Sequence, residues 1–178
     1  YRKSSVFFID TLTGFVGCRE GAIMKTTNSG VTWKLQSTPT TATPIQIQFI
    51  DNNTGWTLAS SGWLSRTTNG GLNWQLISTD RGRFYFLDSV IGFSGGNGSI
   101  KKTTDGGSNW TQIPNIEAGA VFFWDKKNGW AYGTGTYPDY YFTLYNTRDS
   151  GKTWIQSQNQ YYRSCRRIFF IDTLTGWA

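Results

Sequence analysis

Short runs of alternating hydrophobic and polar residues follow one another along this chain, separated by clusters of Gly, Asn, Asp and Ser. Near the N-terminus this pattern predicts strands over residues 6–10, 15–18, 22–26 and 31–35, with turns between them. Four short antiparallel strands within about 40 residues are typical of one blade of a β-propeller. The pattern therefore predicts an all-β protein.

The same unit recurs along the whole chain. The sequence Phe-x-Asp-x-x-x-Gly-aromatic occurs five times, and its successive Asp residues are 41, 37, 37 and 47 positions apart. Such spacing indicates repeated supersecondary units that bury their hydrophobic faces on one another. We expect the Asp of this motif to cap the turn after the first strand of each blade. The five positions are Asp10, Asp51, Asp88, Asp125 and Asp172.

A second motif, Thr-x-Asp/Asn-x-Gly-x-Thr/Asn-Trp, lies between successive copies of the first. Its Asp or Asn can accept hydrogen bonds from amides of its own turn, its Gly can adopt a positive φ, and its Thr can bond to polar groups of the turn. Its Trp begins the outer strand. We predict structural roles for Asn28, Gly30, Trp33, Asn69, Gly71, Trp74, Asp105, Gly107, Trp110, Asp149, Gly151 and Trp154.

The repeats divide the chain into four complete four-stranded antiparallel blades and the start of a fifth, all within one propeller segment, 1–178. The expected blades span residues 4–36, 45–78, 83–114 and 119–157, and the partial fifth blade spans residues 166–178. An open propeller would leave sheet edges and part of its core exposed. We therefore expect a segment of a larger ring. The alternatives are completion by another chain and a closed four-bladed ring with a surplus strand.

The composition agrees with an all-β protein. Aromatic residues make up 17% of the chain and charged residues 16%, with 21 Gly, which favours strands over helices. No run approaches the roughly 18 consecutive apolar residues of a membrane-spanning helix. The net charge of +6 fits an acidic partner and an ordinary solvated surface equally well. Two states are open for Cys18 and Cys165: two free buried thiols, or a disulfide that joins them. We prefer the first interpretation.

The second motif resembles the Asp-box, also called the bacterial neuraminidase repeat, which occurs in sialidases, sortilin-type receptors and xyloglucanases. The whole unit, with Phe-x-Asp-x-x-x-Gly-Trp before the box, is most similar to the photosystem II assembly factor family. The resemblance covers the entire chain and implies a β-propeller of about seven blades. It is specific for the fold and much less so for the function.

Propeller geometry places the Asp-boxes and the first-to-second turns on one face. The opposite face carries the second-to-third loops and the linkers between blades, and it is the expected binding face. There the sequence places eight basic and four acidic residues. Arg suits carboxylate, phosphate and aromatic partners, and the family resemblance also implies docking through an arginine-rich patch. The predicted contacts are Arg81, Arg83, Arg163, Arg166 and Arg167; the alternative is pairing with blade-edge carbonyls.

One insertion adds aromatic residues to the same face. Residues 133–142 lengthen the second-to-third loop of the fourth blade and contain three Tyr and one Phe. Exposed aromatic side chains often anchor partners or stack on sugars. We predict partner contacts at Tyr137, Tyr140 and Tyr141; folding of this loop over its own blade is the equal alternative.

No catalytic, metal or cofactor site is predicted. Seven of the eleven acidic residues belong to the two turn motifs, and the remaining four lie on different blades without a shared motif. A glycosidase needs a carboxylate pair or a Tyr with a carboxylate, and the Phe-Arg-Ile-Pro signature of sialidases is absent. The chain has no His, which excludes His-based triads and His-rich metal sites. An active site in further blades stays open.

These observations favour a non-enzymatic protein-binding or scaffold propeller that docks a partner, such as a larger membrane or surface complex, through its basic face. The alternative is a secreted propeller that binds glycans or hydrolyses glycosides. Nucleic-acid binding is disfavoured because the basic residues form no continuous stripe. Little Lys and Glu with abundant Thr, Asn and Gly suggests a periplasmic or extracellular protein.

Overall fold

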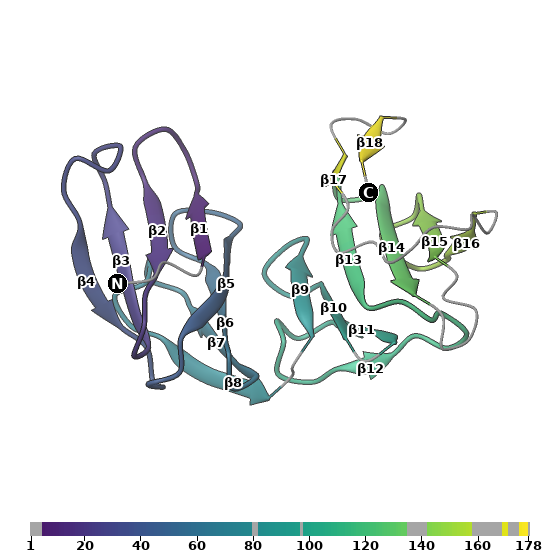
Figure 1. Ribbon diagram of the computed structural model, residues 1–178, viewed down its shortest axis with the longest axis horizontal. Helices are drawn as coiled ribbons and strands as arrows, with labels where there is room; N and C mark the ends of the chain where they lie inside the picture. Colours follow the sequence, from purple (N-terminus) through teal and green to yellow (C-terminus); the bar gives the residue numbers. More distant parts are fainter. Residues whose placement is uncertain are drawn as a thin grey trace. The chain divides into compact units, whose positions relative to one another are not determined.

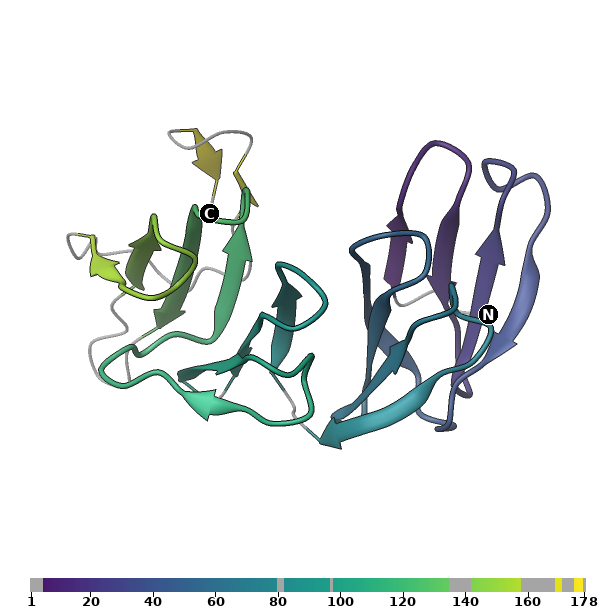
Figure 2. The same ribbon diagram turned by 180° about the vertical axis from the view of Figure 1, so that it is seen from behind.

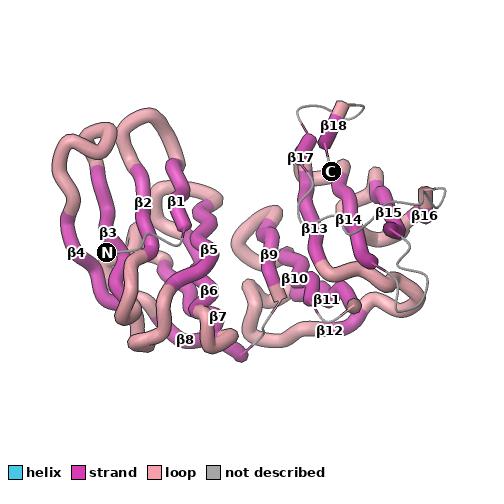
Figure 3. Tube along the Cα trace, viewed as in Figure 1, coloured by secondary structure: helices cyan, strands magenta, loops and turns pink. Residues whose placement is uncertain are grey.

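The computed structural model describes residues 5–79, 82–96, 98–134, 142–157, 169–170 and 175–177. Every regular element in these ranges is a β-strand, and Figure 3 shows strands joined by loops and turns. Within the same ranges no helix has the length and apolar character needed to cross a membrane. The chain divides into two compact units, Tyr1–Arg81 and Gly82–Ala178, which are described separately.

The first unit contains two four-stranded antiparallel sheets in which each strand pairs with its neighbour in sequence (Figure 1). The first sheet consists of β1 (Ser5–Phe8), β2 (Gly14–Gly17), β3 (Ala22–Thr26) and β4 (Lys34–Ser37). The second consists of β5 (Pro44–Phe49), β6 (Gly55–Ala59), β7 (Trp63–Thr67) and β8 (Gln75–Thr79).

The second unit repeats this arrangement, as the reverse view in Figure 2 also shows. Its first sheet consists of β9 (Arg83–Phe86), β10 (Gly92–Gly96), β11 (Ser99–Thr103) and β12 (Thr111–Gln112). Its second consists of β13 (Ala120–Phe123), β14 (Gly129–Thr134), β15 (Phe142–Thr147) and β16 (Ile155–Gln156). A further antiparallel pair joins β17 (Phe169–Phe170) and β18 (Gly176–Trp177).

These sheets confirm the predicted all-β class built from four-stranded antiparallel blades. In the first blade the third strand has the predicted bounds, and the ends of the other three strands are shifted by one to three residues. The first strand ends at Phe8 rather than at residue 10, because Asp10 belongs to the following turn. The fourth strand begins at Lys34 rather than at residue 31, because Asn28 Oδ1 accepts a hydrogen bond from the Thr32 amide and holds that segment in the turn. The residue limits of the blades and their assignment to one propeller segment stay predictions.

A Phe and a Gly of the first motif face each other across the first two strands of each sheet. In the second blade the register pairs Phe49 with Gly55. A Cβ at Gly55 would lie 2.6 Å from the Phe49 ring, which is closer than real Cβ atoms approach other atoms. The ring therefore fills the space that any side chain at this position would need. The equivalent pairs are Phe8 with Gly14, Phe86 with Gly92, and Phe123 with Gly129.

Within each unit the two blades pack through aromatic rings. Strands β1 and β2 lie against β5, and β9 and β10 lie against β13. In the first unit, the Phe15 ring stacks on the Phe49 ring with centroids 4.0 Å apart. In the second, Phe93 stacks on Phe123 at 4.8 Å. Such pairs contribute about 0.5–1.5 kcal/mol beyond their buried area, so the aromatic residue after the motif Gly joins one blade to the next.

A lysine adds a polar link to the same interface. Lys25 on β3 lies over the Phe15 ring, 5.3 Å from its centroid, and Lys25 Nζ donates a 2.8 Å hydrogen bond to the carbonyl oxygen of Gly70 in the Asp-box of the next blade. A Cβ at Gly71 would lie 3.2 Å from Phe15. The Asp-box of the second blade is therefore part of the contact between blades as well as a turn.

Candidate functional site

The four Asp-boxes have one common geometry, built from local hydrogen bonds. In the first box, Thr26 Oγ1 accepts from the amide of Gly30 at 2.9 Å and donates to Asn28 Oδ1 at 2.9 Å. Asn28 Oδ1 accepts from the Thr32 amide at 2.9 Å, and Gly30 has φ 87°. The same bonds and positive φ recur at Thr67 to Gly71, Thr103 to Gly107 and Thr147 to Gly151. In each box these bonds and the positive φ of the Gly hold the turn.

The Asp of the first motif caps the turn between the first and second strands, as predicted. Asp10 Oδ1 accepts from the amides of Leu12 and Thr13 at 2.7 and 2.6 Å. Asp51, Asp88 and Asp125 accept the equivalent pairs of amides.

The two kinds of turn lie together on one face of each blade. In the first blade the Ser29 amide of the Asp-box donates to the Leu12 carbonyl oxygen at 2.9 Å, and Ser29 Oγ donates to the Thr11 carbonyl oxygen at 2.8 Å. Equivalent backbone bonds join the two turns in the other three blades. The predicted placement of both turns on one face is therefore confirmed.

Hydrogen bonding lowers the pKa of five turn carboxylates. The Asn109 amide and side chain lower the pKa of Asp105 to about 2, and bonds from the Thr153 hydroxyl and amide lower the pKa of Asp149 further. Backbone amides of their own turns likewise lower the pKa of Asp10, Asp51 and Asp125. A carboxylate stabilised in this way is a poor general acid near neutral pH. These residues support turns rather than proton transfer.

The sequence prediction assigns the charged residues that bind a partner to the opposite face, and the structure describes some of the residues there. Arg83 begins β9 with an exposed side chain. Arg19 and Glu20, between β2 and β3, are also exposed, as is Glu117 before β13. The remaining predicted contacts lie outside the described residues, so their roles stay predictions: Arg81, Arg163, Arg166, Arg167, Tyr137, Tyr140 and Tyr141.

One exposed aromatic residue near this face was missed by the sequence prediction. Trp63 begins β7, directly after the second-to-third loop, and is 38% exposed. The corresponding strands of the other blades begin with Ala22, Ser99 and Phe142. The sequence did contain a signal for this residue: a Trp directly follows the Ser-Ser-Gly of the loop. Because the position belongs to neither repeat motif, the motifs do not explain a Trp there.

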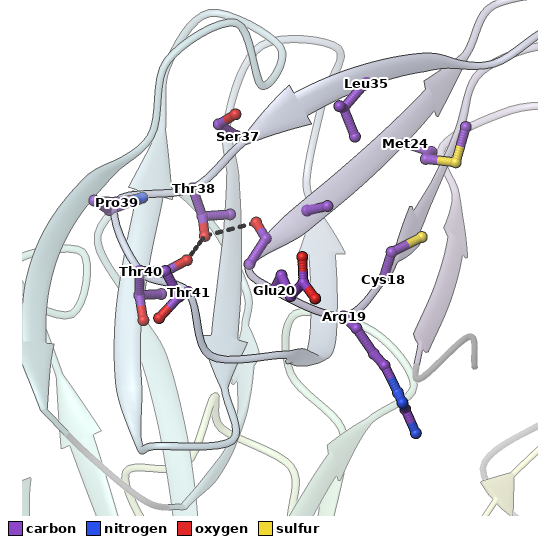
Figure 4. Close-up of a pocket in the computed structure, with 12 residues that line it drawn as sticks. Cys18, Arg19, Glu20, Met24, Leu35, Ser37, Thr38, Pro39, Thr40 and Thr41 are labelled. Atoms are coloured by element: carbon purple, nitrogen blue, oxygen red, sulfur yellow. Dashed lines mark hydrogen bonds between the residues drawn. The ribbon is translucent and has the colours of Figure 1, made fainter. Parts of the chain in front are cut away.

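A hollow of about 700 Å³ lies beside the same loop of the first blade (Figure 4). The side chains of Met24 and Leu35, on adjacent strands, and the thiol of Cys18 form its apolar part. At its other end Thr38 Oγ1 bonds to the carbonyl oxygens of Gly21 and Thr40 at 2.8 and 2.9 Å. Cys18 is a free, buried thiol, whereas Cys165 lies outside the described residues.

A second hollow of about 540 Å³ lies between the two blades of the first unit. One wall is the outer strand β4 and the residues after it, from Lys34 to Pro39, and the other is Leu72, Asn73 and Trp74 of the next Asp-box. Strand β4 and the following segment therefore border both hollows. Within the described ranges no group of three His, Cys, Asp or Glu residues could hold a metal ion.

Comparison with known proteins gives a family match over the middle of the chain. The family model described as Photosynthesis system II assembly factor YCF48 matches residues 24–118, a little over half of the 178 residues. A comparison with curated proteins gave no match.

Solved structures with the same fold include members of this family. A structure described as YCF48 bound to D1 peptide is 19% identical, with a TM-score of 0.67, and the match covers 95% of this chain and 57% of that chain. YCF48 from Cyanidioschyzon merolae is 16% identical, with a TM-score of 0.69, and coverage is 98% and 65%. An ancestral GH74 enzyme is 23% identical, with a TM-score of 0.63, and coverage is 88% and 25%.

These likenesses establish a shared propeller fold. The chain spans a little over half to about two thirds of the length of the two YCF48 structures and a quarter of the GH74 enzyme. The predicted class of Asp-box propeller, similar to the photosystem assembly factor family, is confirmed.

Proposed function

Because this chain belongs to the Photosynthesis system II assembly factor YCF48 family, we propose that it is part of a non-enzymatic propeller that binds a protein partner. The observation that carries this proposal is the family match together with the structure of a family member bound to a peptide. The peptide bound to that family member is described as D1 peptide. For this chain we propose a protein partner without assigning its identity.

The proposed contact surface is the basic face opposite the Asp-boxes. Arg83 is exposed at the start of β9, where its guanidinium can bind carboxylates of a partner. The other cations predicted from the sequence are Arg81, Arg163, Arg166 and Arg167, and Tyr137, Tyr140 and Tyr141 are the proposed aromatic contacts. The exposed ring of Trp63 adds a further candidate contact.

The chemistry of the carboxylates supports a binding role over hydrolysis. The motif Asp residues accept bonds from their own turns, and Glu20 and Glu117 are the remaining described acids outside these turns. They belong to different units, so this part of the chain offers no carboxylate pair within one unit for glycoside hydrolysis. The likeness to GH74 enzymes reflects the fold. A glycan is the alternative partner.

We also propose that the protein acts in the periplasm or outside the cell. The support is compositional: Thr, Asn and Gly are abundant, and the chain has two Glu residues. Fractionation of the source cells, followed by immunodetection, tests this point; recovery in the cytosolic fraction would contradict it.

A comparative pull-down tests the protein-binding proposal. The baits are the wild-type protein, an Arg83→Glu variant, and a variant with all five proposed arginines changed to Glu. A control variant reverses exposed cations on the Asp-box face: Lys126, Lys127, Arg148 and Lys152. Circular dichroism checks that every bait is folded.

We expect wild type and the control to retain the same protein, Arg83→Glu to retain less of it, and the five-site variant to lose it. Equal retention by the wild-type and five-site baits would contradict docking through the basic face. Retention of polysaccharide without protein would favour the glycan alternative.

A further inference from the structure

One blade of the second unit carries cations at turn positions that are uncharged in the other blades. Two of these positions follow the motif Asp after the first strand. The other two lie in the Asp-box, one directly before its Asp or Asn and one three positions after it. All four positions are exposed in each of the four blades, so their exposure comes from the turn geometry and not from the ends of the chain. In the fourth blade they are Lys126, Lys127, Arg148 and Lys152.

The other three blades have small polar or aliphatic residues at these positions. The residues are Thr11, Leu12, Thr27 and Val31 in the first blade, Asn52, Asn53, Thr68 and Leu72 in the second, and Ser89, Val90, Thr104 and Ser108 in the third. The hydrogen bonds that hold the Asp-boxes, and those that join the two turns, recur in all four blades. Folding of the turns therefore does not account for the four cations.

The structure brings these cations together from two segments that are distant in sequence. Lys126 and Lys127 lie on the turn between β13 and β14, whereas Arg148 and Lys152 lie in the Asp-box between β15 and β16. The Ser150 amide donates a 3.0 Å hydrogen bond to the carbonyl oxygen of Lys127 and so joins the two turns. We call the four cations the blade-4 cationic patch.

The acids of the same turns are directed toward their own backbone. Asp125 Oδ1 accepts from two amides of its turn, both at 2.7 Å. Asp149 Oδ1 accepts from two amides of its turn at 3.0 and 2.9 Å. Among the described residues, none of the four cationic side chains forms a hydrogen bond or an ion pair. The two turns together contain four cations and two carboxylates, a net charge of +2.

The positive charge is confined to this blade. The corresponding turns of the third blade, which packs against the fourth within the unit, contain Asp88 and Asp105 and no cation, a net charge of −2. A broad anionic surface such as a membrane would meet both blades, and the carboxylates of the third would repel it. A nucleic-acid strand is better matched by a continuous basic stripe. The patch therefore fits a narrow anionic ligand.

The side chains of the patch indicate the chemistry of this ligand. Arg148 has a planar guanidinium that can bind a carboxylate through two parallel hydrogen bonds, and the three Lys residues add mobile point charges. Four cations on two adjoining turns match a run of carboxylates, because each cation can contact a different carboxylate. The eleven acidic residues of this chain stand singly, so a second copy of it does not supply such a run.

We propose that the blade-4 cationic patch binds a short acidic segment of a protein, one with several consecutive Asp or Glu residues. The site lies on the Asp-box face and is separate from the basic face. It adds a second contact surface to the proposed protein-binding function. Binding of a partner to the basic face does not depend on it.

The test measures fluorescence anisotropy of a labelled peptide with four consecutive Glu residues, and of the same peptide with Gln, in the presence of the full chain. The patch variant carries Lys126→Ser, Lys127→Val, Arg148→Thr and Lys152→Ser, which are the residues of the third blade at these positions. The turns of the third blade fold with these residues, so the variant should fold. The control variant carries Arg19→Glu and Arg83→Glu on the opposite face and changes the net charge by the same amount.

We expect the Glu peptide to bind wild type and the control variant, and to bind the patch variant about tenfold or more weakly, because four exposed ion pairs are lost together. Binding should weaken as the salt concentration rises, and the Gln peptide should not bind. A further variant adds Ser89→Lys, Val90→Lys, Thr104→Arg and Ser108→Lys to the patch variant. It moves the cations to the third blade and should restore binding.

Several results would overturn the proposal. It is wrong if wild type does not bind the Glu peptide, if the patch variant binds it as tightly as wild type, or if the moved cations do not restore binding. Equal loss in the control variant would show that binding follows net charge or the basic face. The acidic segment is also the wrong ligand if an oligothymidine or phosphatidylglycerol vesicles bind wild type more tightly than the peptide and lose binding in the patch variant. None of these results decides the pull-down, which tests the arginines of the basic face.

Discussion

The ring of Phe49 occupies the space that a side chain at Gly55 would need: a Cβ at Gly55 would lie 2.6 Å from the ring. The two residues face each other across β5 and β6. The ring cannot easily move away, because Phe15 stacks on it at 4.0 Å and Trp74 meets it edge-on at 5.8 Å. This pair explains why the motif has Gly six positions after Phe: the small residue lets the ring lie flat on the strand.

Gly55→Ala should therefore destabilise the first unit. Because overpacking in a well-packed core typically costs about 1–3 kcal/mol, we expect a lower free energy of unfolding, measured by urea denaturation. Gly119→Ala is the control, since a Cβ there meets no atom within 4 Å, and it should change the free energy by less than about 0.5 kcal/mol. Equal stability of the two variants would contradict the proposed role of the Phe49 ring.

Removing the hydroxyl of an Asp-box Thr should also be costly. Thr67 is buried, and its Oγ1 accepts from the Gly71 amide at 2.9 Å and donates to Asn69 Oδ1 at 3.0 Å. Thr67→Val keeps the shape but leaves the Gly71 amide without this acceptor, at a cost of about 1–3 kcal/mol. Thr67→Ser retains the hydroxyl and should lose less. Thermal denaturation of the three proteins decides the point, and identical loss in both variants would refute the hydrogen-bond explanation.

Acid should destabilise the Asp-boxes of the second unit. The folded-state pKa of Asp105 is lowered from 3.8 to about 2 by bonds from Asn109. A depressed pKa contributes stability that is present above the unfolded-state value and is lost as pH falls through the folded-state value. We therefore expect the urea concentration at the unfolding midpoint of the wild type to decrease as the pH is lowered from 4 to 2, the range of the cited pKa values.

Asp105→Asn removes this titration while keeping an acceptor oxygen, as Asn28 and Asn69 do in the first unit. Its midpoint should depend less on pH over the same interval. An unchanged dependence would show that Asp105 does not contribute to acid sensitivity.

The link from Lys25 to the next blade can be tested by neutral substitution. Lys25 Nζ donates to the Gly70 carbonyl oxygen at 2.8 Å and lies over Phe15, and desolvation by burial lowers its pKa. Lys25→Met keeps the apolar stem but loses both polar contacts, so we expect a loss of about 1–2 kcal/mol in urea denaturation. Lys34 faces Lys25 across β3 and β4, and Lys34→Met, at an exposed position, should have little effect. A reversed ranking would count against the interblade link.

Much of the blade could be predicted from the sequence because its turns are held by local bonds. The Asp-box acceptors are at most four residues from their donors, and the Asp10 cap reaches only to Leu12 and Thr13. The fourth strand was placed three residues too early, since the turn bond to Thr32 delays its start. Of the predicted partner contacts, the structure describes Arg83 as exposed; the others lie outside the described residues, and no comparison tests their roles.

The sequence by itself determined the all-β repeat, the positions of the turns and the roles of their Asp, Asn, Gly and Thr residues, because these depend on neighbours a few positions away. Only the tertiary structure decided what distant residues do to one another. It placed the Gly70 carbonyl against Lys25 and the Phe15 ring on Phe49. It left the Trp33 indole bonded to Gly30 but the buried Trp74 indole unpaired. The second hollow beside β4 likewise arises because this strand packs near the Asp-box of the next blade, which is distant in sequence.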